Sequence, residues 1–347
     1  MRGQAAHRFL VLDGMRGAAA MMVLIGHATN GYARMSSAAV DLFFLLSGFV
    51  LAHAFGERLA RGDRRIDFLL ERLIRLYPLY LVGLGAGLLV TVFLIAVGIW
   101  WWPPEIFPQA AIAAPFFVPI AFEVTFPLNP PAWSLSFELV ANLVFVMVGW
   151  RHGAAAALVV MVTPLLLWTV ARWGEGGAAW QSLPCGFTRV FFSFFLGVLI
   201  YRLWLSGRVI GISVHPALLL GLVALLYLID LRQEHRYFLF LVFVAHPLLI
   251  WIGANSSATG SWQTLLAWLG WTSYGVYVLH YPIVLIVELA IRAATFDLTA
   301  SEHLHWFTVF IVAGLSLAAS HWLTARLDVP VRAWLLRRLR TRRLQAG

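Results

Sequence analysis

Apolar stretches of about 20 residues recur from one end of the chain to the other, with short polar connections between them. A helix of that length rises roughly 30 Å, which is the thickness of the hydrocarbon core of a bilayer. Barrel strands would instead show short segments of alternating polarity, a pattern that the chain lacks. The pattern predicts an all-α polytopic membrane protein with about ten transmembrane helices, over residues 9–29, 38–56, 77–99, 132–150, 154–171, 186–205, 216–231, 237–253, 270–291 and 305–325.

Two further segments border these spans. Residues 106–122 are apolar but are interrupted by Pro108, Pro115 and Pro119, so we expect an interfacial or re-entrant piece of the longest loop. Residues 265–270 are apolar enough to extend the ninth span at its beginning.

Composition supports the membrane prediction. The chain is 61% apolar with a mean hydropathy of +0.82, and 12% of its residues are charged, against about 25% in an ordinary soluble domain. The single Cys185 permits no internal disulfide and no cysteine metal cluster. Zinc-ligand spacings, a Walker A loop, a dinucleotide fingerprint and a G-x-S-x-G turn are all missing, so we expect no metal.

The formal net charge is +9, and every basic residue is an arginine. The arginines lie between the spans and at the C-terminus, which indicates membrane orientation rather than nucleic-acid binding. With a cytoplasmic N-terminus, 18 of the 25 arginines fall on the cytoplasmic side and five outside, so we expect both termini in the cytoplasm. Residues 1–330 would form the membrane domain and residues 331–347 a basic tail on the inner leaflet.

The first span carries three ionisable residues, Asp13, Arg16 and His27, and we therefore expect it to be retained rather than cleaved as a signal. Asp13 and Arg16 are three residues apart, and His27 follows Arg16 by eleven, an offset of only about 20° around the helix. Charges inside a membrane are costly and commonly functional. His27 is therefore a candidate general base. The alternative is that Asp13 and Arg16 pair with each other and His27 is a satisfied core histidine.

The fourth span begins with a polar stripe. Ser134, Glu138 and Asn142 follow one another at intervals of four and so share a helical face. In the predicted topology Glu138 lies at about the depth of His27, so we expect a pair in which the carboxylate orients the imidazole. The alternative is a structural ion pair between Glu138 and an arginine such as Arg189.

Arg72 and Arg75 precede the third span on the predicted cytoplasmic side. Their spacing of three places both guanidinium groups on one helical face, which suits a pyrophosphate because guanidinium binds phosphate oxygens bidentately. The alternative is that both arginines serve membrane topology alone.

Two signals inside the apolar spans are weaker. Ser47 in the run FFLLSGF, and Tyr277 and His280 in the run TSYGVYVLHYP, are polar positions in the second and ninth spans. They predict either the lining of a substrate path or close helix packing with a satisfied histidine.

Five blocks of the sequence resemble the acyltransferase-3 family of membrane O-acyltransferases, and they occur in the family's order over residues 12–282. The first block pairs Arg16 with His27, and the fourth carries Trp133, Ser134 and Glu138. In the fifth, Val278 and Leu279 precede His280. The blocks are LDGMRGAAAMMVLIGH, DLFFLLSGFVLA, ERLIRLYP, WSLSFE and YGVYVLHYP.

The resemblance implies a bacterial inner-membrane enzyme that takes an acyl group, most simply acetyl, from cytoplasmic acyl-CoA. It also implies an acceptor hydroxyl on a glycan or another exported molecule. His27 would be the base or acyl carrier, with Glu138, Arg16 and Asp13 completing the catalytic group. The donor phosphates would be held by Arg72 and Arg75, and the substrate path would be lined by Trp133, Ser134, Ser47, Tyr277 and His280.

Some members of that family also carry an extracytoplasmic SGNH-type domain, whereas this chain ends at Gly347 soon after the last span. We therefore expect transfer to finish within the membrane domain or to pass to a separate extracytoplasmic protein. The rival interpretation is a multi-helix transporter or flippase of a lipid-linked or small polar substrate. Such proteins often contain inverted repeats with interrupted helices, and none is evident here.

Overall fold

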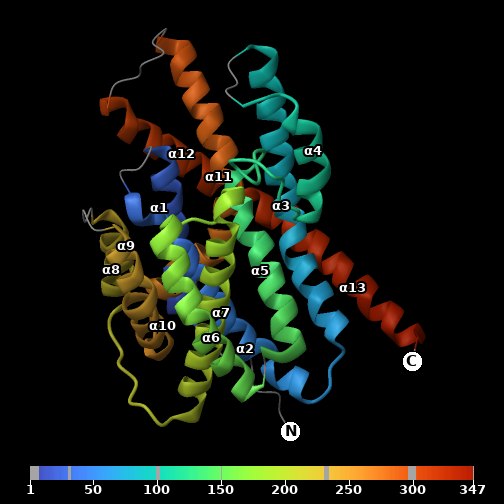
Figure 1. Ribbon diagram of the computed structural model, residues 1–347, viewed down its shortest axis with the longest axis vertical. Helices are drawn as coiled ribbons and strands as arrows, with labels where there is room; N and C mark the ends of the chain where they lie inside the picture. Colours follow the sequence, from blue (N-terminus) through green and yellow to red (C-terminus); the bar gives the residue numbers. More distant parts are fainter. Residues whose placement is uncertain are drawn as a thin grey trace.

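The computed structural model describes residues 8–29, 33–98, 102–149, 151–229, 234–295 and 302–346. Within these ranges every regular element is a helix, and the long helices run roughly side by side (Figure 1). The α-helices are α1 (Leu10–Ala28), α2 (Ala39–Ala60), α3 (Arg65–Ala96), α4 (Ile106–Ala113), α5 (Trp133–Val144), α6 (His152–Trp173), α7 (Leu183–Ser206), α8 (Pro216–Leu228), α9 (Glu234–Phe240), α10 (His246–Asn255), α11 (Ser261–Thr295), α12 (Glu302–Leu323) and α13 (Val329–Ala346).

Among the described residues, nine helical segments are long and apolar enough to cross a membrane, which confirms an all-α polytopic membrane protein. The segment predicted at 216–231 is α8, a helix of 13 residues. It is apolar but shorter than the roughly 20 residues that a full crossing needs. The ninth predicted span begins earlier than residue 270, because α11 starts at Ser261.

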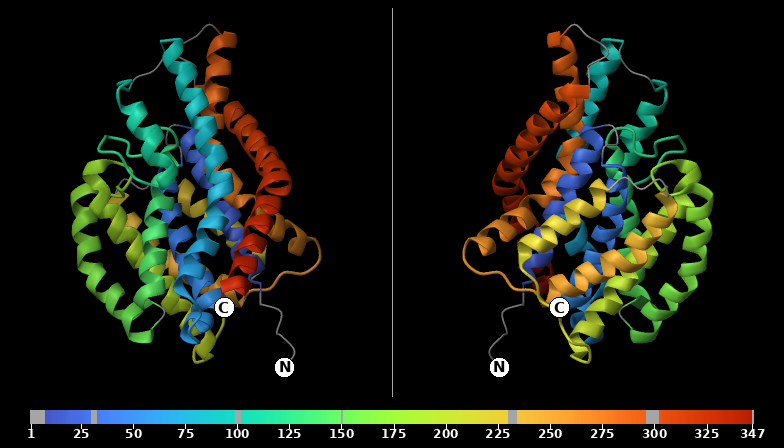
Figure 2. Two further views of the ribbon diagram at one scale, coloured as in Figure 1. Left: turned by 90° about the vertical axis from the view of Figure 1, so that its right-hand side faces the viewer. Right: turned by 90° about the vertical axis from the view of Figure 1, so that its left-hand side faces the viewer.

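Three π-helical segments interrupt or extend the long helices, and one of them changes the predicted C-terminal end. Thr324–Asp328 joins α12 to α13, so the chain continues as a helix beyond the predicted end of the last span. Helix α13 packs against α3 (Figures 1 and 2). The other two, Phe145–Gly149 and Leu241–Ala245, follow α5 and join α9 to α10.

The proline-rich piece of the longest loop forms α4 and the short 3-10 turn Ala114–Phe116. Two tyrosines of α3 hold this piece in place, since the hydroxyls of Tyr77 and Tyr80 donate to the carbonyls of Pro115 and Ala114 at 2.6 Å each. This part of the loop is therefore a short apolar helix fastened to α3, and its interfacial or re-entrant position in the membrane stays a prediction.

Helices α2 and α7 approach each other more closely than ordinary side chains would permit. A Cβ atom on Gly48 would lie 1.9 Å from the carbonyl oxygen of Phe194, and one on Gly197 would lie 2.1 Å from that of Leu45. Small residues allow this kind of contact between membrane helices, where backbone proximity replaces the hydrophobic effect. The Ser-Gly pair of the second span thus serves helix packing through its glycine.

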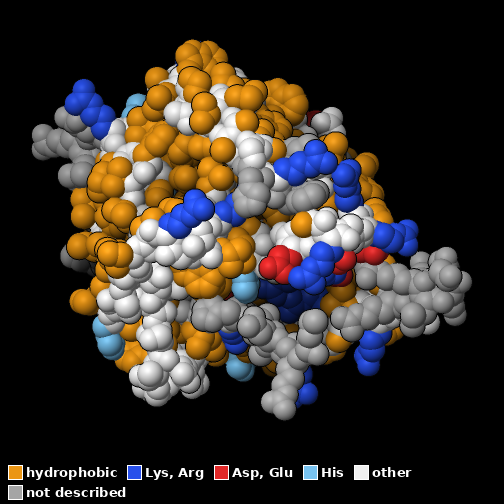
Figure 3. Space-filling model, turned by 90° about the horizontal axis from the view of Figure 1, so that it is seen from below, with side chains coloured by type: hydrophobic (Ala, Val, Ile, Leu, Met, Phe, Trp, Pro, Cys, Tyr) orange, Lys and Arg blue, Asp and Glu red, His pale blue; other side chains and the backbone are white. Residues whose placement is uncertain are grey.

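The end of α13 and the turn between α2 and α3 lie at the same end of the molecule (Figures 1 and 2). Viewed from that end, arginine side chains surround a recess whose floor is also basic (Figure 3). Apolar side chains cover much of the rest of this view. The side of the membrane that this end faces remains a prediction from the arginine distribution.

Candidate functional site

A cavity of about 870 Å³, its open mouth included, lies between α1, α2, α3, α5 and α11. Four charged residues line it: Arg16, Arg72, Arg75 and Glu138. We call it the arginine cavity. Its hydroxyl groups come from Ser47, Ser134, Ser273, Tyr274 and Tyr277. The structure therefore brings together the first, second, third, fourth and ninth predicted spans, each of which contributes a residue selected from sequence.

Glu138 is held from two sides inside the cavity. One carboxylate oxygen accepts from Nη2 of Arg72 at 2.7 Å and from the hydroxyl of Ser47 at 2.6 Å. The side chains of Arg72 and Glu138 are 15% and 14% exposed, so the pair is buried but not sealed. The predicted pair between His27 and Glu138 is wrong, because α5 turns the carboxylate toward α2 and α3 rather than toward α1. The alternative, an ion pair between Glu138 and an arginine, is correct, although the partner is Arg72 and not Arg189.

Arg16, a second arginine of the cavity, also makes its hydrogen bonds within the protein. Its Nη2 donates to Asp13 at 3.0 Å and to the carbonyl of Gly270 at 2.9 Å, and its Nε donates to Ser273 at 3.0 Å. Asp13 also accepts from Arg8 at 2.9 Å. The alternative that Asp13 and Arg16 form an ion pair with each other is therefore confirmed. Arg16 nevertheless keeps a side chain that is 29% exposed and lines the cavity.

Arg75 differs from the other two arginines. It lines the cavity, yet no hydrogen bond or ion pair joins it to any other residue that the structure describes. One turn earlier, Nε of Arg72 is buried without a hydrogen-bond partner in the same described part of the chain. Unpaired charged donors inside a membrane domain are costly. Arg75 therefore presents unpaired donors at the cavity wall, whereas Nε of Arg72 is enclosed by the protein.

The far end of the cavity is lined by hydroxyls rather than charges. The hydroxyls of Tyr277 and Ser134 lie 2.6 Å apart, and the carbonyl oxygen of Pro131 lies 3.0 Å from the first and 3.1 Å from the second. Because each hydroxyl has one proton, one of them donates to the other, which donates to the carbonyl. Only part of the polar stripe predicted on α5 lies in the cavity. Ser134 and Glu138 line the cavity, whereas Asn142 is fully buried outside it.

His27 and His280 lie beyond Tyr277 and do not line the arginine cavity. Their rings are 5.0 Å apart, centroid to centroid, and Nε2 of His280 lies 3.2 Å from Nδ1 of His27. The ring of His280 in turn lies 6.0 Å from that of Tyr277. His280 was expected to line the substrate path; it is instead fully buried between Tyr277 and His27.

Trp133 was also expected to line the substrate path, but it does not line the arginine cavity. Its ring lies 5.3 Å from the guanidinium of Arg189, on the side of α5 that faces α7. Indole rings attract guanidinium groups through the ring quadrupole. Trp133 thus belongs to a second, separate charge cluster.

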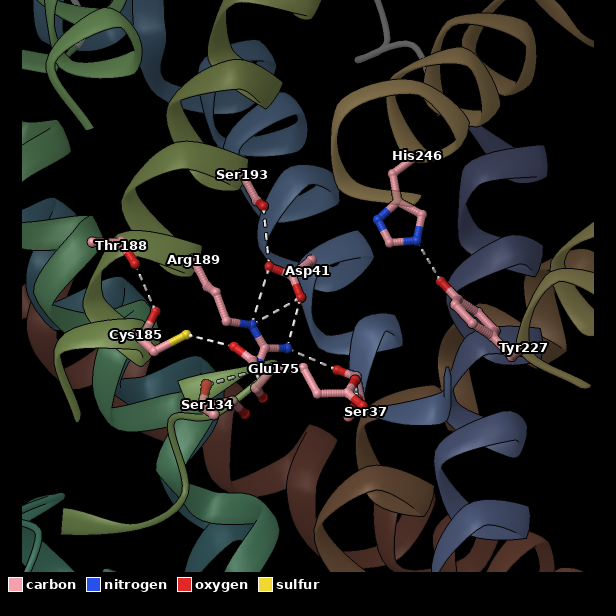
Figure 4. A network of polar contacts seen from close by, with 12 residues as sticks. Ser37, Asp41, Ser134, Glu175, Cys185, Thr188, Arg189, Ser193, Tyr227 and His246 are labelled. Atoms are coloured by element: carbon pink, nitrogen blue, oxygen red, sulfur yellow. Dashed lines mark hydrogen bonds and ion pairs between the residues drawn. The ribbon is translucent and has the colours of Figure 1, made fainter. Parts of the chain in front are cut away.

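That second cluster is shown in Figure 4. Arg189 and Asp41 form an ion pair at 2.7 Å, and both side chains are completely buried. The other guanidinium donors of Arg189 bond the carbonyls of Ser37, Glu175 and Gly176, and Ser193 donates to Asp41 at 3.3 Å. We call this group the closed cluster, because every donor of the guanidinium is satisfied within the protein.

Several residues of these sites were not selected from sequence, and Ser273 and Asp41 are two examples. Ser273 lies one turn before Tyr277, so its helical position was a readable signal for a cavity residue. Asp41 was visible only as an acidic residue near the start of an apolar span, and its partner lies 148 residues away. In the part of the chain that the structure describes, no group of three or more metal-ligating side chains occurs.

A family model described as an acyltransferase domain matches residues 9–325 of the chain. The chain therefore belongs to the acyltransferase-3 family, and with its helices it is a membrane-spanning acyltransferase. The resemblance drawn from the five sequence blocks is thereby confirmed.

Individual relatives are between 25% and 36% identical to the chain over the aligned residues. Protein 2 in picA locus of Rhizobium radiobacter is 36% identical over 183 residues, which cover 47% of this chain and 94% of that protein. The exopolysaccharide production protein ExoZ of Rhizobium meliloti is 27% identical over 348 residues, which cover 94% and 98%. The putative peptidoglycan O-acetyltransferase YrhL of Bacillus subtilis is 25% identical, and this chain spans 49% of its length. No solved structure matches the chain.

Proposed function

We propose that this enzyme transfers an acyl group, most simply acetyl, from acyl-CoA to a hydroxyl of a cell-surface glycan. The observation that carries the proposal is the arginine cavity, where the unpaired guanidinium group of Arg75 lies beside Arg16 and Arg72 at the wall of an open cavity. The names of the relatives support the reaction class. YrhL is named a putative peptidoglycan O-acetyltransferase, OatA of Listeria monocytogenes (25% identical) a peptidoglycan O-acetyltransferase, and ExoZ an exopolysaccharide production protein.

The donor would enter with its phosphates at the three arginines. Arg75 would provide a bidentate contact without losing any other bond, and Arg16 and Arg72 would add positive charge at the same wall of the cavity. A hydrogen bond between charged groups contributes about 1.5–3 kcal/mol. Because Arg72 and Arg75 lie close to the beginning of α3, this end of the cavity would face the cytoplasm of a bacterial cell and its acyl-CoA pool.

The acyl end of the donor would then point toward Tyr277 and Ser134. Tyr277 lies one turn beyond Ser273 along α11, so the hydroxyl end of the cavity is farther from the arginines and closer to the histidines. His27 would remove the proton of the acceptor hydroxyl as it attacks the thioester carbonyl, or carry the acyl group in passing. The acceptor would approach His27 from the outer end of α1.

Turnover by the purified protein tests this function. The enzyme in lipid nanodiscs would receive acetyl-CoA and oligosaccharides released from the surface glycans of its own host. Release of free CoA thiol and a gain of one acetyl group in the oligosaccharide mass are the expected results. A transporter would bind or move its substrate but release no thiol, and that outcome would contradict the proposal.

His27→Ala supplies the matched control. A positioned general base typically contributes 10²- to 10⁴-fold to rate, so this variant is expected to lose at least about 10²-fold in thiol release. It should still elute as the wild-type protein does, because His27 is only half-buried. Full activity in this variant would remove His27 from the mechanism.

A further inference from the structure

The contacts between His27 and His280 determine where the imidazole protons lie. Nδ1 of His27 is 2.9 Å from the carbonyl oxygen of Val23, and Nδ1 of His280 is 3.1 Å from that of Val276. A carbonyl oxygen can only accept a hydrogen bond, so each Nδ1 must carry a proton to make these contacts. In a neutral ring this leaves Nε2 without a proton.

One arrangement satisfies every contact with both rings neutral. Nε2 of His280 accepts from the Nδ1 proton of His27 across the 3.2 Å contact, and that proton is shared with the carbonyl of Val23. The reverse direction would place a lone pair of His27 against the Val23 carbonyl. It would also require either a second such clash at His280 or a charged His280, which is completely buried and contacts no carboxylate in the described chain.

The other side of the His27 ring is open. Its Nε2 has no hydrogen-bond partner among the described residues, and its side chain is half-buried whereas His280 is completely buried. The ring of Tyr281 also meets the His27 ring edge-on, at 5.7 Å between centroids. The unprotonated nitrogen of His27 is therefore the one that a ligand can reach.

Close packing of α1 on α11 keeps the two histidines in register. A Cβ atom on Gly17 would lie 2.8 Å from the carbonyl oxygen of Leu269, so the two backbones are in contact near the inner end of both helices. Arg16 reinforces this contact through Gly270 and Ser273. The imidazole rings of His27 and His280 lie farther along the same two helices. The contacts at Gly17 and Arg16 limit sliding of α1 against α11 and so keep the two rings together.

We propose that His280 is a positioning residue, which holds His27 in the Nδ1–H tautomer so that Nε2 is the reacting nitrogen. The inference rests on the proposed function. As the acceptor oxygen bonds to the thioester carbonyl, its proton moves to Nε2 of His27. His27 then carries a positive charge, and its Nδ1–H bond to His280 becomes charge-assisted. When the carbon–sulfur bond breaks, the departing thiolate takes the proton from Nε2, which yields the ester and free CoA.

This arrangement resembles the orienting pair of a catalytic triad, with a neutral imidazole in place of the carboxylate. Two substitutions of His280 test whether His27 needs a hydrogen-bond acceptor at this position. His280→Gln keeps an amide oxygen that can accept from His27, whereas His280→Leu has no acceptor. His246→Gln is the matched control, because that histidine is equally buried and bonds only Tyr227 among the described residues.

The expected result is a loss of about 10²-fold in kcat for His280→Leu and of no more than about tenfold for His280→Gln. The KM for acetyl-CoA should stay within about twofold of wild type in both, because His280 lies outside the arginine cavity. His246→Gln should retain wild-type kcat. An unchanged kcat in His280→Leu, or equal losses in the leucine and glutamine variants, would overturn the proposal.

A measurement without turnover separates this inference from the proposed function. Solid-state NMR of protein with 15N-labelled histidine rings, compared with His27→Ala, isolates the signals of His27. A protonated Nδ1 and an unprotonated Nε2 are expected, and a weaker preference is expected in His280→Leu, where the carbonyl of Val23 is the one remaining acceptor among the described residues. The opposite tautomer in the wild type would refute the inference even if the enzyme is active. Thiol release that is absent from a protein with the expected tautomer would instead refute the proposed function.

Discussion

Two clusters of charged residues lie inside the helical bundle, and they differ in what they leave unsatisfied. In the closed cluster, Arg189 bonds Asp41 and three carbonyls, and no part of either side chain reaches solvent. In the arginine cavity, Arg75 bonds nothing among the described residues and Arg72 leaves Nε free. Both clusters incur the cost of placing charge in a membrane domain. Only the second keeps donors available for a ligand.

The comparison teaches that an intramembrane charge is not by itself a sign of function. Arg189 joins α7 to α2 and to the segment at Glu175 and Gly176, so it holds the bundle together. Arg75 holds nothing and faces a cavity. The number of hydrogen bonds that a guanidinium leaves unmade, rather than its depth, separates a structural arginine from a binding one.

The largest expected effect is the loss of the closed cluster. Arg189→Leu leaves Asp41 buried without a counterion, and removing one partner of a buried pair costs about 3–5 kcal/mol. We expect the variant to unfold at a much lower temperature in detergent than wild type, or to fail to accumulate. Fluorescence-detected size-exclusion chromatography over a temperature series measures this.

The double variant Asp41→Leu/Arg189→Leu sharpens that test. It removes both charges, so no uncompensated ion remains, and it should recover more than half of the lost stability. A single variant as stable as wild type would show that the closed cluster is not structural, and the contrast with the arginine cavity would fail.

The second effect is on donor binding. Arg75→Leu removes a charged donor that has no hydrogen-bond partner within the described residues. We therefore expect the KM for acetyl-CoA to rise by about tenfold, which equals about 1.4 kcal/mol. The free energy of unfolding should stay within about 0.5 kcal/mol of wild type. Arg61→Leu is the control, since Arg61 lies near the same end of the molecule but is 75% exposed and pairs with Glu57. An unchanged KM in Arg75→Leu would remove the phosphate role from this residue.

The smallest effect is expected at Ser47. Ser47→Ala deletes one of the two bonds to Glu138, while Arg72 keeps the other, so the free energy of unfolding should fall by about 1 kcal/mol and the donor KM should stay within about twofold. Calorimetry and initial-rate measurements on the same preparation test both values. A variant of normal stability that has lost turnover would instead assign Glu138 a direct part in the reaction.

Prediction from sequence succeeded where a single helix carries the information. Hydropathy located the spans, and only α8 is shorter than expected, because 13 residues cannot cross a bilayer alone. Spacing within one helix correctly placed Asp13 beside Arg16, and Ser134 and Glu138 on one face toward the cavity. These relations depend only on the helical repeat.

Prediction failed where two helices had to be rotated against each other. Glu138 was expected beside His27 and lies instead against Arg72 and Ser47. His27 found a partner in His280, 253 residues away, and Trp133 turned toward Arg189 rather than the cavity. A rotation of a helix by one residue, about 100°, redirects every side chain on it, and no local pattern records that angle.

The sequence by itself determined that this chain is a helical membrane protein of an acyltransferase type, because the length of an apolar run and the order of five short blocks are properties of the chain alone. The tertiary structure alone decided which arginine is satisfied and which is free, and which nitrogen of His27 is open. Those properties arise from contacts between helices, and glycines such as Gly48 and Gly197 set how closely the helices approach.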